Sequence, residues 1–383
     1  MNLTHGFISV DDHVQEAPDV WTSRLSRARW GDRIPHIEAM SDGIERWMVD
    51  GQPLAMEGVV NAGALMADRA RPPRRWDEAP RAAYVPKARL AAMDTDGVDY
   101  SVLYPTVAGI GGETFGRISD PELELECVRA YNDWLIDEWA ASSERFIPQC
   151  IVPLFPAEAA AREIERAIGR GHRGVIYPAV PMELRDVPHV NDAAYEPIWS
   201  ACEALNVPLC IRAGSASSIQ APAPAGLSPA VAAAYRSITG STSMICVLVN
   251  LLVSGILERH PKLNVVFAGS GLGWGAYQFE YTDQQFTANG LLGQGHEHLP
   301  SELLRRQCYL TGWYGQAGVE GRRFVGTRNI LWAANFPLAT STWPSTHEYI
   351  NRAFQGVPPE ERDQMLQGNA VRLYPIRGSS TTA

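Results

Sequence analysis

The feature that most constrains the fold of this chain is an alternation of short apolar runs with longer amphipathic stretches. Eight runs rich in β-branched or aromatic residues predict strands, and helical spacing follows most of them. This alternation implies parallel strands joined by crossover helices, and eight such units in 383 residues predict a single (β/α)8 TIM barrel over residues 1–377. The predicted strands are residues 7–10, 100–104, 146–152, 174–177, 208–213, 264–268, 307–310 and 330–334, and the predicted helices are residues 121–142, 157–170, 193–205, 228–259, 274–286 and 345–354.

The alternative architecture is an open doubly wound sheet. No GxGxxG motif opens a helix after the first predicted strand, and we interpret the glycine-rich residues 269–273 as a tight turn. Residues 22–85 are rich in Arg, Trp, Pro and Gly and do not fit a minimal barrel. We predict that they form a long insertion after the first strand, acting as a lid or an oligomer arm. Residues 378–383 are predicted to be a disordered tail.

Composition excludes several classes of partner. The chain has 33 Lys and Arg against 43 Asp and Glu, and this net charge of −10 argues against binding nucleic acid or an anionic membrane. No stretch of 18 uninterrupted apolar residues occurs, so no transmembrane helix is expected, and the first residues lack a signal-peptide pattern. The six cysteines are scattered without a CxxC motif, which is typical of reduced cytoplasmic proteins. We therefore expect a cytoplasmic protein that acts on a small molecule.

Polar residues gather at the ends of three predicted strands. Asp11 and His13 follow the first predicted strand and are separated by one residue, so their side chains point to the same face at the end of that strand. This spacing suits two ligands of one metal ion, or a carboxylate and an imidazole that act on one substrate. Arg212 ends the fifth strand and Asn335 follows the eighth. Because the carboxyl ends of barrel strands meet at one mouth, we expect these four side chains to lie together.

Several motifs together resemble one family. The chain is similar to the amidohydrolase-related TIM barrels, in the branch that contains aminocarboxymuconate-semialdehyde decarboxylase and γ-resorcylate decarboxylase. The similarity covers nearly the whole chain in the expected order, and it implies a carboxy-lyase-like enzyme that forms a homodimer or homotetramer. The motifs are ISVDDHVQEAPDVW at 8–21, RLAAMDTDGVD at 89–99, YNDWL at 131–135, GLGW at 271–274, and LWAANFP at 331–337 followed by STWP at 341–344.

The resemblance also implies a metal site from which this chain departs. Such relatives take metal ligands from the first-strand pair, a His ending strand five and an Asp ending strand eight, with a His or Glu after strand six and often a later His. Asp11 and His13 match the first pair. The other four positions hold Arg212, Gly269, Asn335 and Leu338.

These departures have an electrostatic direction. Asn335 in place of Asp removes a negative charge, and Arg212 in place of His adds a positive one. A guanidinium about 4 Å from a divalent cation is repelled by roughly 8 kcal/mol at an effective dielectric constant near 20, and it offers no lone pair to a metal. We therefore predict that the chain holds no metal and no other cofactor, and that Arg212 forms a bidentate salt bridge with Asp11.

The predicted function is acid/base chemistry without hydrolysis, such as decarboxylation, elimination, isomerisation or cyclisation of an anionic or conjugated small molecule, in specialised metabolism. One alternative is a metal-dependent decarboxylase or hydrolase with an unusual ligand set; another is a non-catalytic binding pseudoenzyme. Glu16 is interpreted as a structural carboxylate, Glu113 as a weak candidate, and His296 and His298 as surface-loop residues. The predicted catalytic residues are His13, Asp11 and Arg212, and the predicted substrate-binding residues are Tyr104, Tyr177, Asn335, Trp313, Trp343 and His347.

Overall fold

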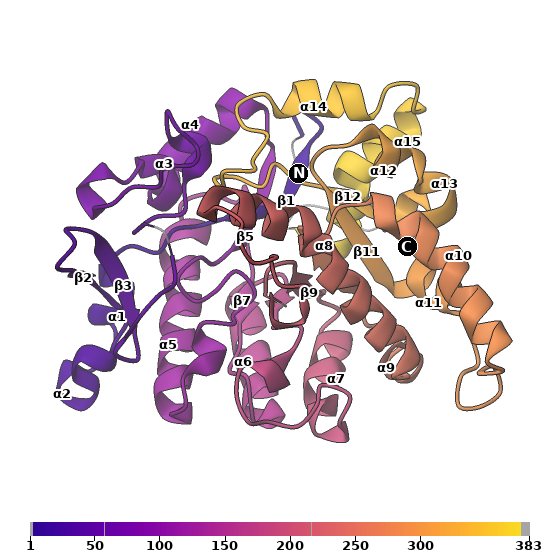
Figure 1. The fold of residues 1–383 in the computed structure, drawn as a ribbon, viewed down its shortest axis with the longest axis horizontal. Coiled ribbons are helices and arrows are strands. Elements are labelled where there is room, and N and C mark those ends of the chain that lie inside the picture. Colours follow the sequence, from indigo (N-terminus) through magenta and orange to yellow (C-terminus); the bar gives the residue numbers. More distant parts are fainter. Residues whose placement is uncertain (1–2, 57, 216, 377–383) are drawn as a thin grey trace.

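The structure, a computed structural model, describes residues 3–56, 58–215 and 217–376 (Figure 1). Its centre is a set of parallel strands in two ladders, one in the order β1-β5-β6 and the other β12-β11-β10-β9-β8-β7. Only Gln149 separates β6 from β7, so these two segments form one interrupted barrel strand. The barrel strands are β1 (Ile8–His13), β5 (Tyr100–Tyr104), β6 (Phe146–Pro148), β7 (Cys150–Ile151), β8 (Val175–Ile176), β9 (Leu209–Arg212), β10 (Val265–Ala268), β11 (Cys308–Gly312) and β12 (Ile330–Trp332).

The two outer edges, β1 and β12, meet through individual hydrogen bonds instead of a regular ladder. The amide of His13 donates to the carbonyl of Phe336 at 2.6 Å. In the other direction, the amide of Ala334 donates to Ser9 Oγ at 2.8 Å. These bonds bring the eighth strand position back to the first, and the predicted (β/α)8 architecture is confirmed.

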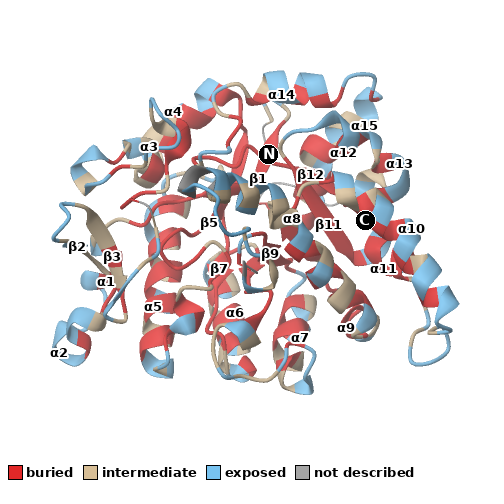
Figure 2. Ribbon diagram, in the orientation of Figure 1, coloured by how far each residue is buried: buried red, intermediate tan, exposed pale blue. Residues whose placement is uncertain are grey.

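Helices surround the strands and bury one face against them, as Figure 2 shows. In α6, Ala157, Ala160, Ile164 and Ala167 are buried, and their spacing of three and four residues places them on one face of the helix. The predicted bounds of α6 are confirmed. The helices are α1 (Asp19–Thr22), α2 (Arg27–Trp30), α3 (Arg81–Tyr84), α4 (Pro86–Asp96), α5 (Pro121–Trp134), α6 (Ala157–Arg170), α7 (Glu196–Ala204), α8 (Pro229–Val253), α9 (Ile256–Arg259), α10 (Gly273–Ala288), α11 (Pro300–Gln307), α12 (Gln316–Glu320), α13 (Arg322–Val325), α14 (Thr346–Ala353), α15 (Pro359–Asp363) and α16 (Asn369–Leu373).

The insertion after β1 contains a small antiparallel sheet of β2 (His36–Ala39), β3 (Glu45–Val49) and β4 (Gln52–Pro53). Trp47 of β3 is buried and packs edge-on against Trp21. The sheet lies beside α1 (Figure 1), and the residues that follow β4 line a cavity together with the loop after β5. The insertion therefore reaches the end of the barrel where we expected it, and its role as a lid or oligomer arm stays a prediction. The predicted tail at 378–383 lies outside the described residues.

One helix bears on the expectation that the chain has no transmembrane helix. Within α8, the window Ala234–Val253 has a mean hydropathy of 1.4 and is long and apolar enough to span a membrane by length and composition. A search for uninterrupted apolar residues misses it because Ser, Thr, Gly and one Arg are interspersed. Core helices of soluble proteins meet the same criterion, so the window alone is weak evidence of a span. One third of it is buried inside the structure, and α8 contacts α9, α10 and α11.

His172, at the opposite end of the barrel from the mouth, predicts a pH dependence of stability. Its Nε2 lies 3.0 Å from the carbonyl of Asn132, and burial lowers its pKa from 6.5 to about 4. The unfolded chain therefore binds a proton on His172 below pH 6.5 that the folded chain does not bind. The neutral, buried His172 therefore contributes to the free energy of unfolding above pH 6.5, and this contribution is lost as the pH falls toward 4. Between pH 7 and pH 5 the loss attributable to His172 is about 2 kcal/mol.

Urea unfolding at pH 7 and pH 5 tests this prediction. The decrease in unfolding free energy on acidification should be about 2 kcal/mol smaller in His172→Gln than in the unsubstituted chain. His189→Gln, at an exposed position, is the matched control and should retain the full decrease. An equal decrease in all three proteins would contradict a neutral buried His172.

Candidate active site

Asp11 and His13 lie on the inner face of β1, as their spacing predicts. His13 Nε2 is 3.4 Å from Asp11 Oδ1, and both residues are fully buried. The pairing of β1 with β5 shifts register between Ser9 and Asp12. This irregularity lets Asp12 bond Ser9 Oγ at 2.8 Å and Ser101 Oγ at 2.6 Å. Asp12 thus accepts hydrogen bonds that hold β1 against β5. Its sequence neighbours Asp11 and His13 face Arg212 instead.

Arg212, the last residue of β9, connects Asp11 with Asn335. Its Nε lies 3.2 Å from Asp11 Oδ1, its Nη2 donates to Asn335 Oδ1 at 2.8 Å, and its Nη1 donates to the carbonyl of Ala213 at 3.0 Å. The predicted salt bridge is present, but it has one contact and is not bidentate, because the terminal nitrogens are engaged elsewhere. Asn335 has a left-handed backbone with φ of 57°, and its Nδ2 donates to Thr340 Oγ1 at 2.7 Å. Its orientation is therefore fixed from both sides.

The charges in this cluster set the protonation of its members. Desolvation acts to raise the pKa of Asp11, but the charge of Arg212 and the neighbouring His13 ring outweigh it and hold this pKa below its usual value. Desolvation and the Arg212 charge lower the pKa of His13 despite the nearby Asp11. His13 Nδ1 lies 3.1 Å from the carbonyl of Pro105. At neutral pH, the cluster is therefore a carboxylate, a neutral imidazole and a guanidinium.

Gly269, directly after β10, provides the space for the guanidinium. Its φ is 60°, and a Cβ at this position would lie 3.1 Å from Arg212 Cζ and 3.2 Å from Asp11 Oδ2. Residues with a Cβ rarely adopt this backbone conformation, and any residue larger than glycine at position 269 would have to displace Arg212 or Asp11. Gly269 stands at the position where the resemblance implies a His or Glu. The arginine at 212 and the glycine at 269 are thus sterically coupled.

A cavity of about 620 Å³ opens beside this cluster at the mouth of the barrel. Arg212, Gly269 and Asn335 line it, together with Trp274 and Trp313. Asp11 and His13 do not line this cavity. Of the three predicted catalytic residues, Arg212 is therefore the one that reaches the space where a ligand fits, and the other two lie behind it.

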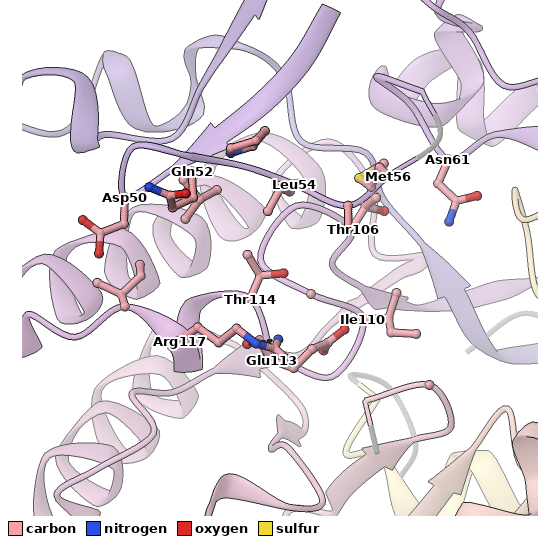
Figure 3. A pocket seen from close by; sticks show the side chains of 16 residues that line it. Asp50, Gln52, Leu54, Met56, Asn61, Thr106, Ile110, Glu113, Thr114 and Arg117 are labelled. Carbon is pink, nitrogen blue, oxygen red and sulfur yellow. Dashed lines mark hydrogen bonds between the residues drawn. The ribbon is translucent and has the colours of Figure 1, made fainter. Parts of the chain in front are cut away.

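A second cavity of about 670 Å³ lies between the insertion and the loop after β5 (Figure 3). Ile110 and Gly214 line both cavities, so the two spaces adjoin. Glu113 and Arg117 lie on the side of this cavity opposite Asp50. Desolvation raises the pKa of Glu113, and its Oε2 accepts a hydrogen bond from the amide of Gly111 at 2.8 Å. From the sequence alone Glu113 is a weak candidate, because nothing in the motif shows that a glycine-rich loop directs it into a cavity.

Glu16 holds the loop that carries these groups. Its carboxylate accepts hydrogen bonds from the amides of Thr106 at 3.1 Å and Val107 at 2.9 Å. It is fully buried, and burial raises its pKa to about 7. Glu16 therefore connects the end of β1 to the start of the loop after β5, and its interpretation as a structural carboxylate is confirmed.

The structure places three predicted substrate-binding residues away from the cavities. The hydroxyl of Tyr177, which follows β8, donates a hydrogen bond to the carbonyl of Leu154 at 2.7 Å. Trp343 donates Nε1 to the carbonyl of Ala92 at 3.1 Å, and His347 Nε2 lies 2.9 Å from the carbonyl of Gly97. The sequence predicts that the chain stays at the mouth after each strand end. Instead, the segment after β12 crosses to the end of α4, and Tyr177 points outward into a cluster with Tyr195 and Trp199.

The other predicted substrate-binding residues lie at or below the mouth. Trp313 and Asn335 line the cavity beside Arg212. Tyr104 is fully buried inside the barrel, with its ring centroid 5.8 Å from that of His13, and it does not line either cavity. The structure thus places Trp313 and Asn335 where a ligand can touch them, and Tyr104 beneath them.

The residues present do not fit the metal site that the resemblance implies. Asp11 Oδ2 and His13 Nε2 are buried without a hydrogen-bond partner, so two possible ligand atoms remain. Asn335 Oδ1 is occupied by the guanidinium of Arg212. In the described part of the chain, no group of three or more His, Cys, Asp and Glu side chains is arranged to hold a metal ion.

His298 pairs with Glu258 at 2.7 Å and His296 packs on Phe286, which agrees with their interpretation as loop residues.

Comparisons with known proteins agree with this fold. The sequence model of the amidohydrolase family matches residues 74–376. A γ-resorcylate decarboxylase of Rhizobium radiobacter is 26% identical over 197 residues, 48% of this chain and 55% of the relative. The chain thus spans about half the length of this curated relative. A γ-resorcylate decarboxylase of Polaromonas sp. (strain JS666) is 24% identical over 319 residues, 80% of this chain and 92% of the relative.

Solved structures extend the likeness over nearly the whole chain. An amidohydrolase from Mycobacterium avium subsp. paratuberculosis has a TM-score of 0.76 at 20% identity, covering 97% of this chain and 100% of its own. A 2,6-dihydroxybenzoate decarboxylase from Rhizobium has a TM-score of 0.67 at 17% identity, covering 97% and 99%. A dihydroxybenzoic acid decarboxylase from Polaromonas sp. JS666, solved with bound manganese and 2-nitroresorcinol, has a TM-score of 0.63 at 18% identity, covering 99% and 98%. At these identities the likeness shows the fold.

Proposed function

This chain belongs to the amidohydrolase family, and from that premise we propose that it is a non-hydrolytic lyase, a decarboxylase in type, in which Arg212 takes the electrostatic role of a metal ion. The substrate class is a carboxylated aromatic or conjugated small molecule. The family match and the γ-resorcylate decarboxylases among its relatives support the reaction type. Arg212, Gly269 and Asn335 stand where the resemblance implies metal ligands or a catalytic residue, and these substitutions support a mechanism without a metal ion.

The observation that carries this proposal is the position of the Arg212 guanidinium. A guanidinium has five N–H groups, and three of them are engaged by Asp11, Asn335 and Ala213. Two N–H groups remain on a side chain that lines the cavity. They can donate to a phenolate or enolate oxygen and stabilise its negative charge. Because Asp11 and Asn335 fix the guanidinium beforehand, little reorganisation is needed when charge develops.

The reaction is a proton-for-carboxylate exchange at carbon. A proton is added to the ring or chain carbon that bears the carboxylate, the bond between that carbon and the carboxylate breaks, and carbon dioxide leaves. The electron pair of the broken bond returns to the conjugated system. Arg212 holds the oxygen conjugated with that carbon, and Trp313 supplies an aromatic wall for a flat substrate. Nothing in this sequence of steps requires an activated water.

The proton donor that the geometry favours is Glu113. It faces the cavity that adjoins that of Arg212, and desolvation raises its pKa, which favours the protonated form needed for donation. His13, for which the sequence predicts acid/base chemistry, is buried behind Arg212 and lines neither cavity. In this geometry Asp11 and His13 are positioning residues, which act on a substrate through Arg212.

Carbon dioxide release from a panel of hydroxybenzoates in D2O tests the proposal. The panel includes 2,6-dihydroxybenzoate and 5-carboxyvanillate, and the product should carry deuterium at the carbon that lost the carboxylate. Glu113→Gln should lower kcat by about 10²-fold with little change in KM. Asp50→Asn, across the same cavity, is the matched control and should retain kcat. Binding of the panel without turnover would favour the pseudoenzyme alternative, and an unchanged kcat in Glu113→Gln would contradict its role as proton donor.

A metal-dependent enzyme with an unusual ligand set is the second candidate. The unpartnered Asp11 Oδ2 and His13 Nε2 favour it, since both atoms are of the type that binds zinc or manganese. Metal binding at these two atoms requires the Arg212 side chain to move away from Asp11, which it contacts at 3.2 Å. Near-stoichiometric metal in the purified protein, lost together with activity in His13→Ala, would favour this candidate over the first.

A further inference from the structure

Arginines line a small cavity at the end of the barrel opposite the mouth. The cavity measures about 260 Å³ and lies where β11 and β12 begin, between α11 and α16. Figure 1 shows α11 and β11 side by side in this part of the molecule. The cavity belongs to neither space described above. Its lining residues are Arg305, Arg306, Tyr309, Arg328, Asn329 and Arg372. We call it the arginine cavity.

The four arginines of this cavity are not neutralised by neighbouring carboxylates. Among the described residues, no Asp or Glu oxygen lies within 4 Å of their guanidinium nitrogens. Arg322 nearby differs from these four arginines, because it forms ion pairs with both Glu320 and Glu361. The C-terminal ends of α11 and α16 each contribute only about half a negative charge. The arginine cavity thus keeps roughly three positive charges in a chain whose net charge is −10.

Three of the guanidinium groups are held in place by neutral acceptors. Arg305 donates to the carbonyl of Phe324 at 3.2 Å, and Arg306 donates to the carbonyl of Leu257 at 3.2 Å. Arg372 donates to the carbonyl of Arg328 at 3.0 Å. These bonds fix the side chains without cancelling their charge, and each guanidinium retains further N–H donors. The side chain of Arg328 makes no hydrogen bond with any described residue, so it is available to a ligand.

Tyr309 and Asn329 complete the cavity. Tyr309, the second residue of β11, is 7% exposed, and its hydroxyl makes no hydrogen bond with a described residue. Asn329 donates Nδ2 to the carbonyls of Arg305 and Cys308 at 3.0 and 2.8 Å. These bonds join the end of α11 to the start of β12 and make a fixed floor. The site is therefore a cationic cavity with an available hydroxyl on a preorganised frame.

We propose that the arginine cavity binds a small multivalent oxyanion of the phosphate type, such as inorganic pyrophosphate. Guanidinium groups match the oxygens of phosphate in paired hydrogen bonds, and several of them around one cavity favour an anion with more than one charge. The volume lies just below the range that accommodates drug-sized ligands, which selects a small anion. The barrel separates this site from the mouth, so the inference does not depend on the proposed lyase activity.

Calorimetric titration of the full chain with pyrophosphate, at constant ionic strength, tests the proposal. Saturable binding of one anion per chain is expected, with phosphate binding more weakly and chloride not competing at equal ionic strength. Arg328→Gln should weaken the affinity about tenfold or more, because it removes charge-assisted hydrogen bonds. Its side chain has no structural partner, so this variant should retain the unfolding temperature of the unsubstituted chain in the absence of ligand.

Arg162→Gln on α6 is the matched control, since it removes the same charge from another exposed position. It should leave the pyrophosphate affinity unchanged. The proposal is overturned if no saturable binding occurs at millimolar pyrophosphate, or if Arg162→Gln weakens binding as much as Arg328→Gln does. The second result would show that the anion responds to overall charge and not to this cavity.

Discussion

Replacing Arg212 by alanine is expected to lower kcat for carbon–carbon bond cleavage by about 10²- to 10³-fold. This is the range measured when a preorganised donor to a developing negative charge is removed from an enzyme. The guanidinium lines the cavity at the mouth of the barrel beside Gly269 and Asn335, and Arg236 of α8 is the other charged residue in its lining. Loss of the Arg212 guanidinium removes the donors to a substrate oxygen and leaves the shape of the aromatic wall at Trp313 unchanged. Steady-state kinetics on the substrate found in the decarboxylation panel measures the effect.

Stability must be separated from catalysis in this experiment. Alanine at 212 leaves Asp11 buried without its cationic partner, and breaking a buried ion pair on one side costs about 3–5 kcal/mol. The double variant Arg212→Ala with Asp11→Asn removes both charges and should recover most of this stability without recovering activity. Arg212→Lys keeps a charge but loses the planar fork, and it should retain only part of kcat. Wild-type kcat in a folded Arg212→Ala protein would rule out the proposed role.

Reversing two of the departures is expected to restore a metal site. Arg212→His combined with Asn335→Asp should raise the affinity for Zn²⁺ or Mn²⁺ by at least ~10³-fold. The change removes an estimated repulsion of roughly 8 kcal/mol, and a thousandfold gain requires only about half of it. It also supplies an imidazole and a carboxylate beside Asp11 Oδ2 and His13 Nε2, which already lack hydrogen-bond partners. Competition with a chromophoric chelator measures the affinity, and elemental analysis measures the stoichiometry.

Asn335→Asp alone is the control for this design. It adds the carboxylate but keeps Arg212, whose Nη2 already contacts position 335 at 2.8 Å. The new carboxylate should pair with the guanidinium, so the metal affinity should rise little. If the double variant binds metal no better than this single variant, the assignment of positions 212 and 335 to the ligand set that the resemblance implies is incorrect.

The barrel could be predicted from the sequence because its strands are buried on both faces and read as short apolar runs. All eight predicted strand regions contain a barrel strand, with ends that differ by a few residues. The cluster of Asp11, His13, Arg212 and Asn335 was predictable for a related reason, since strand ends converge at one mouth. Resemblance placed Gly269, and the structure supplied its physical reason, a Cβ that would meet Arg212.

The substrate-binding residues were harder to predict because they depend on the path of loops. Trp343 follows the eighth strand in sequence, yet it donates to the carbonyl of Ala92 in α4, away from the mouth cavities. Tyr177 follows the fourth strand and turns outward, because its hydroxyl reaches the carbonyl of Leu154. Glu113 was undervalued for the opposite reason, since hydrogen bonding within a glycine-rich loop brings it to a cavity. No periodicity in the sequence encodes these directions.

The metal content of the active protein tests the central claim most directly. The protein is purified without added metal, and zinc, manganese and iron are measured per chain before and after exhaustive chelation, with decarboxylation assayed on the same samples. The account predicts a metal content well below one ion per chain and activity that chelation leaves unchanged. A content of one ion per chain that falls with activity on chelation, and is restored with it on adding manganese, would contradict the account and return Arg212 to a secondary role.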